Sequence, residues 1–144
     1  MNPITLKTVY YTLFHSIITY GIISWGGAYN NYKKLLQTVQ DKILKIVNKN
    51  ASHVRHNPLN ITQSFILESI IYHYPKLSHS YLLSHSKTRN KIILIPKRYK
   101  TVSSKSSYIA AINIFNKLPL ELKNLKVSKR ILKVKIKTWI CKNV

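Results

Sequence analysis

Residues 20–27 constrain the fold most, because they separate the only two segments with a clean apolar face at helical spacing. The segment before them carries Leu6, Val9, Tyr10, Leu13, Phe14 and Ile17. The segment after them carries Tyr32, Leu35, Leu36, Val39, Ile43, Ile46 and Val47. Gly26 and Gly27 accept positive φ, which suits a helix C-cap and a sharp reversal. The sequence therefore predicts a helical hairpin, with Tyr20 and Trp25 buried near its corner.

Further helix patterns follow a polar connector over residues 51–58. A third helix is predicted from Leu59, capped by Asn60 or Thr62 and ending at Tyr74 and Pro75. Residues 78–86 are compatible with a short separate helix. Ser106 or Ser107 is expected to cap a helix that ends before Pro119, followed by a turn whose leucines point inward.

One short segment has strand character. Residues 92–95 form a run rich in β-branched side chains that Pro96 stops, which predicts a buried strand or extended segment. The predicted fold class is therefore mainly α, a helical hairpin or bundle with a short extended or β segment near residues 91–102.

The last segment has two possible structures. Residues 132–137 alternate apolar and basic side chains, which is a strand pattern. If residues 131–138 are helical instead, the cations of the segment gather within about 100° of arc. These cations are Lys126, Lys129, Arg130, Lys133 and Lys137.

Charge is the outstanding feature of the composition. The 144 residues include 24 Lys and Arg but only 3 Asp and Glu, a formal net charge of +21. So much positive charge repels itself in a compact state and needs anions to screen it. Nucleic acid is the commonest such partner, and an anionic membrane surface is the second possibility. An AT-rich genome would explain the use of lysine but not the shortage of acids.

Two clusters of cations are candidate nucleic-acid contacts. In the second helix, Lys34, Lys42, Lys45 and Lys49 fall at about 200–280° from Tyr32, away from the apolar face. An ordinary solvated face is the alternative for these lysines. The second cluster is Lys97, Arg98, Tyr99 and Lys100, which offers phosphate contacts and a ring for base stacking. A turn with a half-buried tyrosine explains it equally well.

The side chains needed for catalysis are scarce. Polymerase or nuclease chemistry with two metal ions needs adjacent carboxylates, but Asp41, Glu68 and Glu121 lie on separate segments. His53 and His56 have no third metal ligand nearby, and a glycine-rich phosphate loop is absent. We therefore expect no enzymatic activity, no cofactor and no bound metal.

A membrane location is not predicted. Residues 8–25 are apolar over about 18 positions, near the lower limit for a spanning helix. They contain several Thr and Ser residues and a histidine, which disfavour a membrane span, and no signal-peptide pattern precedes them. We expect an intracellular protein of the nucleus or cytoplasm.

Three blocks of the sequence resemble one protein family. The segment LKTVYYTLFHSIITYGIISWGG, a polar turn and KKLLQTVQDKILKIV resemble the region after the palm in jockey-like non-LTR retrotransposon reverse transcriptases. Residues 115–123 resemble the WN-x-LP-x-x-L signature near the C-terminus of those proteins, with Phe115 where Trp is usual. Residues 88–90 and 92–95, before that signature, and residues 128–142, after it, also fall in the expected order, so the resemblance spans nearly the whole chain.

The resemblance implies the thumb and C-terminal region of an RNA-directed DNA polymerase that lacks its palm and fingers. Residues 1–50 would be a thumb-like helical hairpin, residues 51–90 a helical connector and residues 91–144 a basic C-terminal extension. The resemblance also favours a helix for the closing segment, residues 128–142, with Trp139 and Ile140 packed on the core.

In this reading, the chain grips the backbone of RNA or an RNA–DNA hybrid. The contacts would come from the two clusters above and from Arg130, Lys133 and Lys137. The missing palm and fingers domain would be a second partner, and no membrane would be involved. The alternative is a non-enzymatic remnant that acts only as a protein-interaction or anionic-membrane-surface module.

Overall fold

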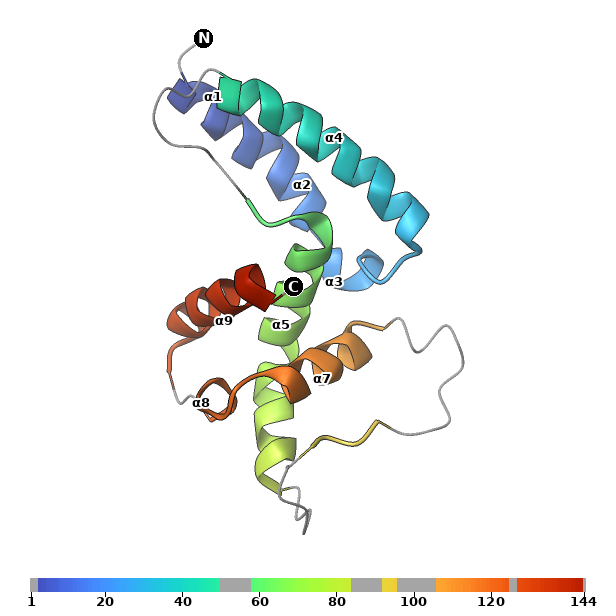
Figure 1. The fold of residues 1–144 in the computed structure, drawn as a ribbon, viewed down its shortest axis with the longest axis vertical. Helices are drawn as coiled ribbons and strands as arrows, with labels where there is room; N and C mark the ends of the chain where they lie inside the picture. The colour runs from blue at the N-terminus through green and yellow to red at the C-terminus, as the bar shows by residue number, and fades with distance from the viewer. Residues whose placement is uncertain (1–2, 50–57, 84–91, 96–105, 125–126, 144) are drawn as a thin grey trace.

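The structure, a computed structural model, describes residues 3–49, 58–83, 92–95, 106–124 and 127–143 (Figure 1). Nearly all of these residues are helical, and none of them forms a strand. The predicted mainly-α fold is confirmed. Among these described parts, no helix combines the length and the apolar character needed to cross a lipid bilayer.

The predicted helical hairpin is confirmed. The hairpin begins with α1 (Pro3–Val9), the π-helical η1 (Tyr10–His15) and α2 (Ser16–Thr19), which together we call the first arm. These three elements follow one another with helical backbone angles at the joints. The short α3 (Ile22–Trp25) lies at the corner, and α4 (Asn30–Lys49) runs back beside the first arm (Figure 1).

The corner differs from the prediction in two respects. Tyr20 is not buried but 86% exposed, whereas Trp25 is partly buried and donates its indole N–H to the Tyr20 carbonyl at 3.1 Å. The positive φ lies at Gly21, at 62°, and not at Gly26, whose φ is −66°. Gly26 is needed for another reason, because a Cβ there would lie 2.4 Å from Cδ2 of Phe65.

The central helix is longer than predicted. It is α5 (Ile61–Leu83), and it passes through Pro75 instead of ending there, so residues 78–83 belong to it and not to a separate helix. Packing explains why the helix tolerates the proline, because Tyr74, Leu77 and Tyr81 remain buried on both sides of it. The predicted cap at Asn60 is confirmed: its side-chain oxygen accepts from the Gln63 N–H at 2.7 Å, and the Gln63 side chain accepts from the Asn60 N–H.

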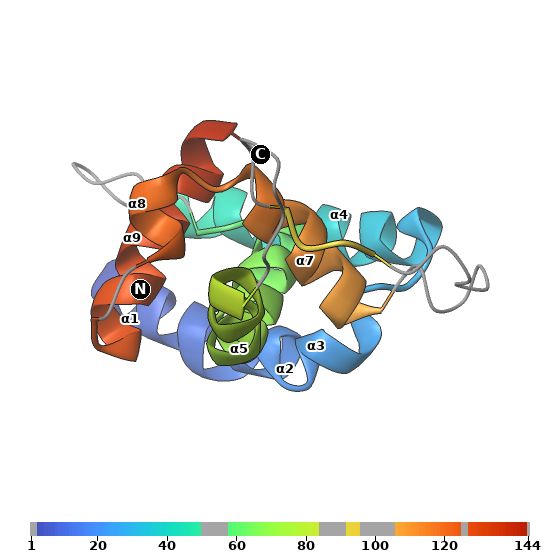
Figure 2. The ribbon, with the colours of Figure 1, turned by 90° about the horizontal axis from the view of Figure 1, so that it is seen from below.

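The C-terminal helices are α7 (Ser107–Lys117), α8 (Leu120–Lys123) and α9 (Lys129–Asn143). Both α7 and α9 pack against α5, which Figure 2 shows nearly end-on, with α2 and α3 on one side of it and α7 on another. The Ser106 cap is confirmed, since its hydroxyl accepts from the Ile109 N–H at 3.4 Å. The closing segment is a helix, as the resemblance implied.

One hydrophobic core joins these helices. Its buried side chains include Ile70 and Leu77 of α5, Phe115 of α7, and Ile136 and Ile140 of α9. Trp139 packs against this core while partly exposed. In the turn after α7, Leu118 is buried, but Leu120 is 65% exposed and does not point inward as predicted.

Residues 92–95 are neither a strand nor fully buried. Ile93 and Ile95 pack against the core, whereas Leu94 is 86% exposed. The side chain of Asn116 holds the segment, because it accepts from the Ile93 N–H and donates to the Ile93 carbonyl, both at 3.0 Å. The Asn116 side chain therefore forms with Ile93 the two backbone hydrogen bonds that a neighbouring strand would otherwise form. Residues 91 and 96–102 of the predicted extended region lie outside the described residues.

The orientation of α4 also differs from the prediction. Much of its apolar face remains uncovered, including Tyr32, Leu35, Leu36, Val39 and Ile46. Val47 of that face is buried, and so is Gln40, which the apolar pattern places to one side of the face. The helix is thus rotated about its axis relative to the prediction, so that the side carrying Gln40 faces the protein. Two hydrogen bonds hold this orientation, because the Gln40 amide donates to the Tyr10 hydroxyl at 3.0 Å and to the Leu59 carbonyl at 3.1 Å.

The close packing at Gly26 gives a first prediction. Gly26→Ala should lower the free energy of unfolding by about 2 kcal/mol, since the new methyl group collides with the buried Phe65 ring. Gly21→Ala is the matched comparison, because nothing lies within 4 Å of its Cβ and only the left-handed backbone opposes it, at about 1 kcal/mol. Urea denaturation followed by circular dichroism measures both, and a greater loss for Gly21→Ala would contradict this packing.

Candidate nucleic-acid interface

The four predicted lysines of α4 are all exposed. Lys34, Lys42, Lys45 and Lys49 form no ion pair with any described residue. The only acid of the helix, Asp41, accepts a hydrogen bond from the Gln37 amide at 2.9 Å instead. This surface, which we call the α4 lysine face, is therefore available to external anions.

A groove begins beside the α4 lysine face. It lies between the start of α4 and the start of α5, encloses about 440 Å³, and has Lys33, Lys34, Asn60 and Thr62 among its lining residues. Lys33 was missing from the predicted contacts. Its position in the sequence places it at one edge of the apolar face, so only the observed rotation of α4 brings it to a groove.

The predicted cations of α9 are exposed as well, but one of them has an internal partner. Lys133 Nζ lies 2.5 Å from Glu68 Oε1 of α5, the only ion pair found within the described parts of the chain. Arg130 and Lys137 form no ion pair with these residues. Lys137 instead lies beside a cleft between α9, α5 and the first arm.

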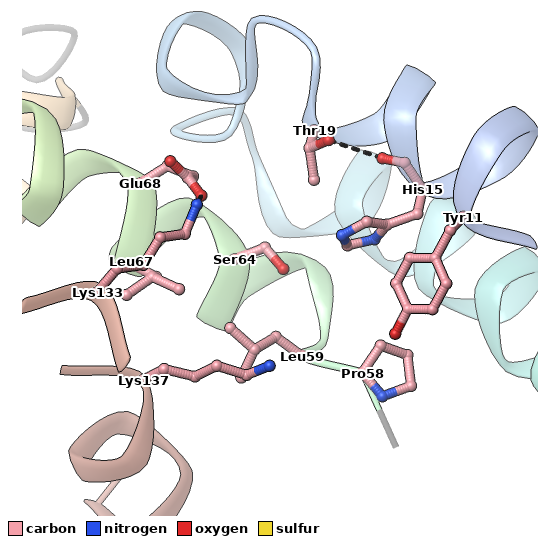
Figure 3. Close-up of a pocket in the computed structure, with 10 residues that line it drawn as sticks. All are labelled: Tyr11, His15, Thr19, Pro58, Leu59, Ser64, Leu67, Glu68, Lys133 and Lys137. Atoms are coloured by element: carbon pink, nitrogen blue, oxygen red, sulfur yellow. Dashed lines mark hydrogen bonds and ion pairs between the residues drawn. The ribbon is translucent and has the colours of Figure 1, made fainter. Parts of the chain in front are cut away.

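We call this cleft the α9 cleft. It encloses about 120 Å³, and its lining residues are Tyr11, His15, Thr19, Pro58, Leu59, Ser64, Leu67, Glu68, Lys133 and Lys137. Figure 3 shows the Ser64 hydroxyl, the His15 ring and the Lys137 ammonium directed toward the same space, while the Lys133 ammonium reaches Glu68. The cleft thus brings together polar side chains from three separate segments.

The charge around the α9 cleft affects its histidine. Partial burial lowers the pKa of His15, and the positive charges of Lys137 and Lys133 lower it further, while Glu68 acts in the opposite direction. Burial and the two lysines thus favour the uncharged form of the imidazole. Its ring packs against the rings of Tyr10 and Tyr11, at centroid distances of 5.9 Å and 5.3 Å.

Several predicted residues cannot be placed in this interface. Lys97, Arg98, Tyr99 and Lys100 lie outside the described residues, and so do Lys126, His53 and His56. α4 and α9 together line a groove near Cys141, with Gln37, Gln40 and Asp41 of α4, and none of the predicted cations lines that groove.

Sequence reasoning missed His15 and Ser64 as site residues. Neither belongs to a recognisable motif, because their shared space depends on how the first arm and α9 pack around α5. Spacing within the sequence carries no signal for such a site.

The described residues contain no group of three potential metal ligands among His, Cys, Asp and Glu. The three carboxylates of the sequence lie on three different helices, with Asp41 on α4, Glu68 on α5 and Glu121 on α8. The arrangement is chemically suited to binding anions through cations and hydroxyl groups.

Comparisons of the chain with protein-family models, with curated proteins and with solved structures found no match in any of the three.

Proposed function

We propose that this chain is a non-catalytic, thumb-like module of a retrotransposon RNA-directed DNA polymerase, and that it binds the backbone of RNA or an RNA–DNA hybrid. The observation that carries the proposal is the α4 lysine face, in which four exposed lysines form no ion pair with the described residues and only Asp41 of the same helix offsets their charge. We name this polymerase family because three blocks of the sequence resemble it. The missing palm and fingers domain would be the protein partner of the chain.

The length of α4 suits this task. From Lys34 to Lys49 the helix rises by about 22 Å at 1.5 Å per residue. That length corresponds to roughly six base-pair steps of a duplex at about 3.4 Å each. Several lysines can therefore contact phosphates at once, and contacts to phosphates alone bind without reading bases.

Removal of the lysine charges should weaken this binding. A variant with Lys34, Lys42, Lys45 and Lys49 changed to Gln should bind a labelled RNA–DNA hybrid roughly 100-fold more weakly in 50 mM salt, because phosphate contacts are lost. Fluorescence anisotropy measures the affinity, and hybrids of different sequence should give similar values.

The control variant changes Lys7, Lys117, Lys135 and Lys142 to Gln. These four lysines are also exposed, so the control has the same net charge as the first variant but keeps the α4 lysine face. It should keep most of the affinity. Equal losses in the two variants would show that total charge alone governs binding and would refute a defined interface.

A second candidate function rests on the exposed apolar side chains of both arms of the hairpin. On the first arm Leu13 and Ile17 are 62% and 73% exposed, and on α4 Leu35 and Val39 are 69% and 45% exposed. Exposed apolar groups in such numbers are typical of protein contact sites. This observation favours a protein-interaction module, whether or not the chain also binds nucleic acid.

The charge of α4 indicates the chemistry of such a protein partner. At about 100° per residue, Lys42 and Lys49 follow directly beside the apolar positions around the helix. A complementary surface has an apolar centre bordered by carboxylates. We therefore propose an acidic amphipathic surface, such as a helix with leucines at helical spacing flanked by glutamates.

Two synthetic helical peptides test this second candidate. One has a leucine stripe flanked by Glu, and the other has the same stripe flanked by Lys. The acidic peptide should bind, and Leu35→Gln together with Val39→Gln should weaken its binding at least tenfold, since each removes buried apolar contact. Isothermal titration calorimetry measures both affinities. Equal binding of the two peptides, or no effect of the substitutions, would contradict the candidate.

A further inference from the structure

The α9 cleft combines three features that suit a small anion. Its side chains provide an ammonium group from Lys137, a hydroxyl group from Ser64 and an imidazole from His15. Ser64 is almost fully buried, and Lys137 forms no ion pair with the described residues. These groups come from α9, α5 and the first arm, so the fold and not one local segment assembles them.

Electrostatic balance favours an anion in this cleft. The Lys133 ammonium and the Glu68 carboxylate form an ion pair at the edge, which removes most of the repulsion that Glu68 would exert. Lys137 then supplies the uncompensated positive charge. Burial lowers the pKa of His15 most, and Lys137 and Lys133 lower it further, whereas an anion near the ring would raise it.

The cleft is large enough for a phosphate group. Its volume of about 120 Å³ exceeds several-fold the roughly 10–15 Å³ that a single water molecule needs on the same measure. A phosphate group with four oxygens therefore fits between the three side chains. Because the cleft is open to solvent, the remaining substituents of a phosphate ester can extend out of it.

We propose that the α9 cleft binds one phosphate group, held by the Lys137 ammonium and the Ser64 hydroxyl beside the His15 ring. The phosphate group is either free phosphate or the phosphorylated end of a nucleic-acid strand. In the second case the inference rests on the proposed function and adds a contact to strand ends that the α4 lysine face does not provide. Free phosphate would occupy the cleft without any nucleic-acid binding.

The test follows the ring of His15 by NMR. The titration uses the whole chain with inorganic phosphate, at ionic strength matched with chloride, and His15→Gln identifies the signal. Phosphate should raise the pKa of His15 by about one unit, because an adjacent anion stabilises the imidazolium. The other charged or titratable groups near the ring are Tyr10, Tyr11, Glu68, Lys133 and Lys137, and they are the same in both salts.

Two variants make this test specific. Lys137→Gln should weaken phosphate binding about tenfold through loss of a charge-assisted contact. Lys135→Gln removes one charge from the same helix without lining the cleft and should bind as the unchanged chain does. No shift of His15 in 20 mM phosphate, or equal losses in both variants, would overturn the proposal.

A second arm distinguishes the two sources of the phosphate group. Labelled RNA–DNA hybrids with and without a 5′-phosphate are compared in the unchanged chain and in Lys137→Gln. A several-fold preference for the phosphorylated end, lost in Lys137→Gln, identifies strand ends as the source. A response of His15 without that preference supports a site for free phosphate. Absence of hybrid binding with an intact His15 response would refute the proposed function while supporting the cleft.

Discussion

Scarcity of negative charge is the constraint on which the rest of the structure depends. With three carboxylates against 24 cations, few ion pairs can join the helices, and within the described residues only the Lys133–Glu68 pair between α9 and α5 does so. Neutral groups join them instead. The Gln40 amide links α4 to Tyr10 and Leu59, and the Tyr74 hydroxyl donates to the Leu122 carbonyl at 2.8 Å. Amides and hydroxyls make these contacts between helices, and most cations of the described residues are exposed to solvent.

Features that depend on neighbouring residues in the sequence could be predicted. The hairpin, the Asn60 and Ser106 caps and most helices follow from apolar spacing and from side chains that accept backbone hydrogen bonds. Features that depend on distant packing could not. Pro75 within α5 and the contact between Gly26 and Phe65 each require a partner far along the chain.

The orientation of α4 shows most clearly why part of the interface escaped prediction. An apolar stripe indicates which side of a helix is usually buried, but it does not show that two glutamines anchor the helix. Gln37 accepts from the Ile61 N–H at 2.9 Å, and Gln40 reaches Tyr10 and Leu59. These contacts leave the stripe open while keeping the lysines exposed, as predicted. The α9 cleft escaped prediction for the same reason, since three separate segments form it.

The central claim is that the lysines of α4 exchange their counterions for nucleic-acid phosphates. The most direct test is the slope of log affinity against log salt for an RNA–DNA hybrid, measured by fluorescence anisotropy on samples shown to be folded by circular dichroism. Changing Lys34, Lys42, Lys45 and Lys49 to Gln should reduce the magnitude of the slope by about 3, at about 0.7–0.9 per contact. An unchanged slope, or no binding of the folded chain at low salt, would contradict the claim.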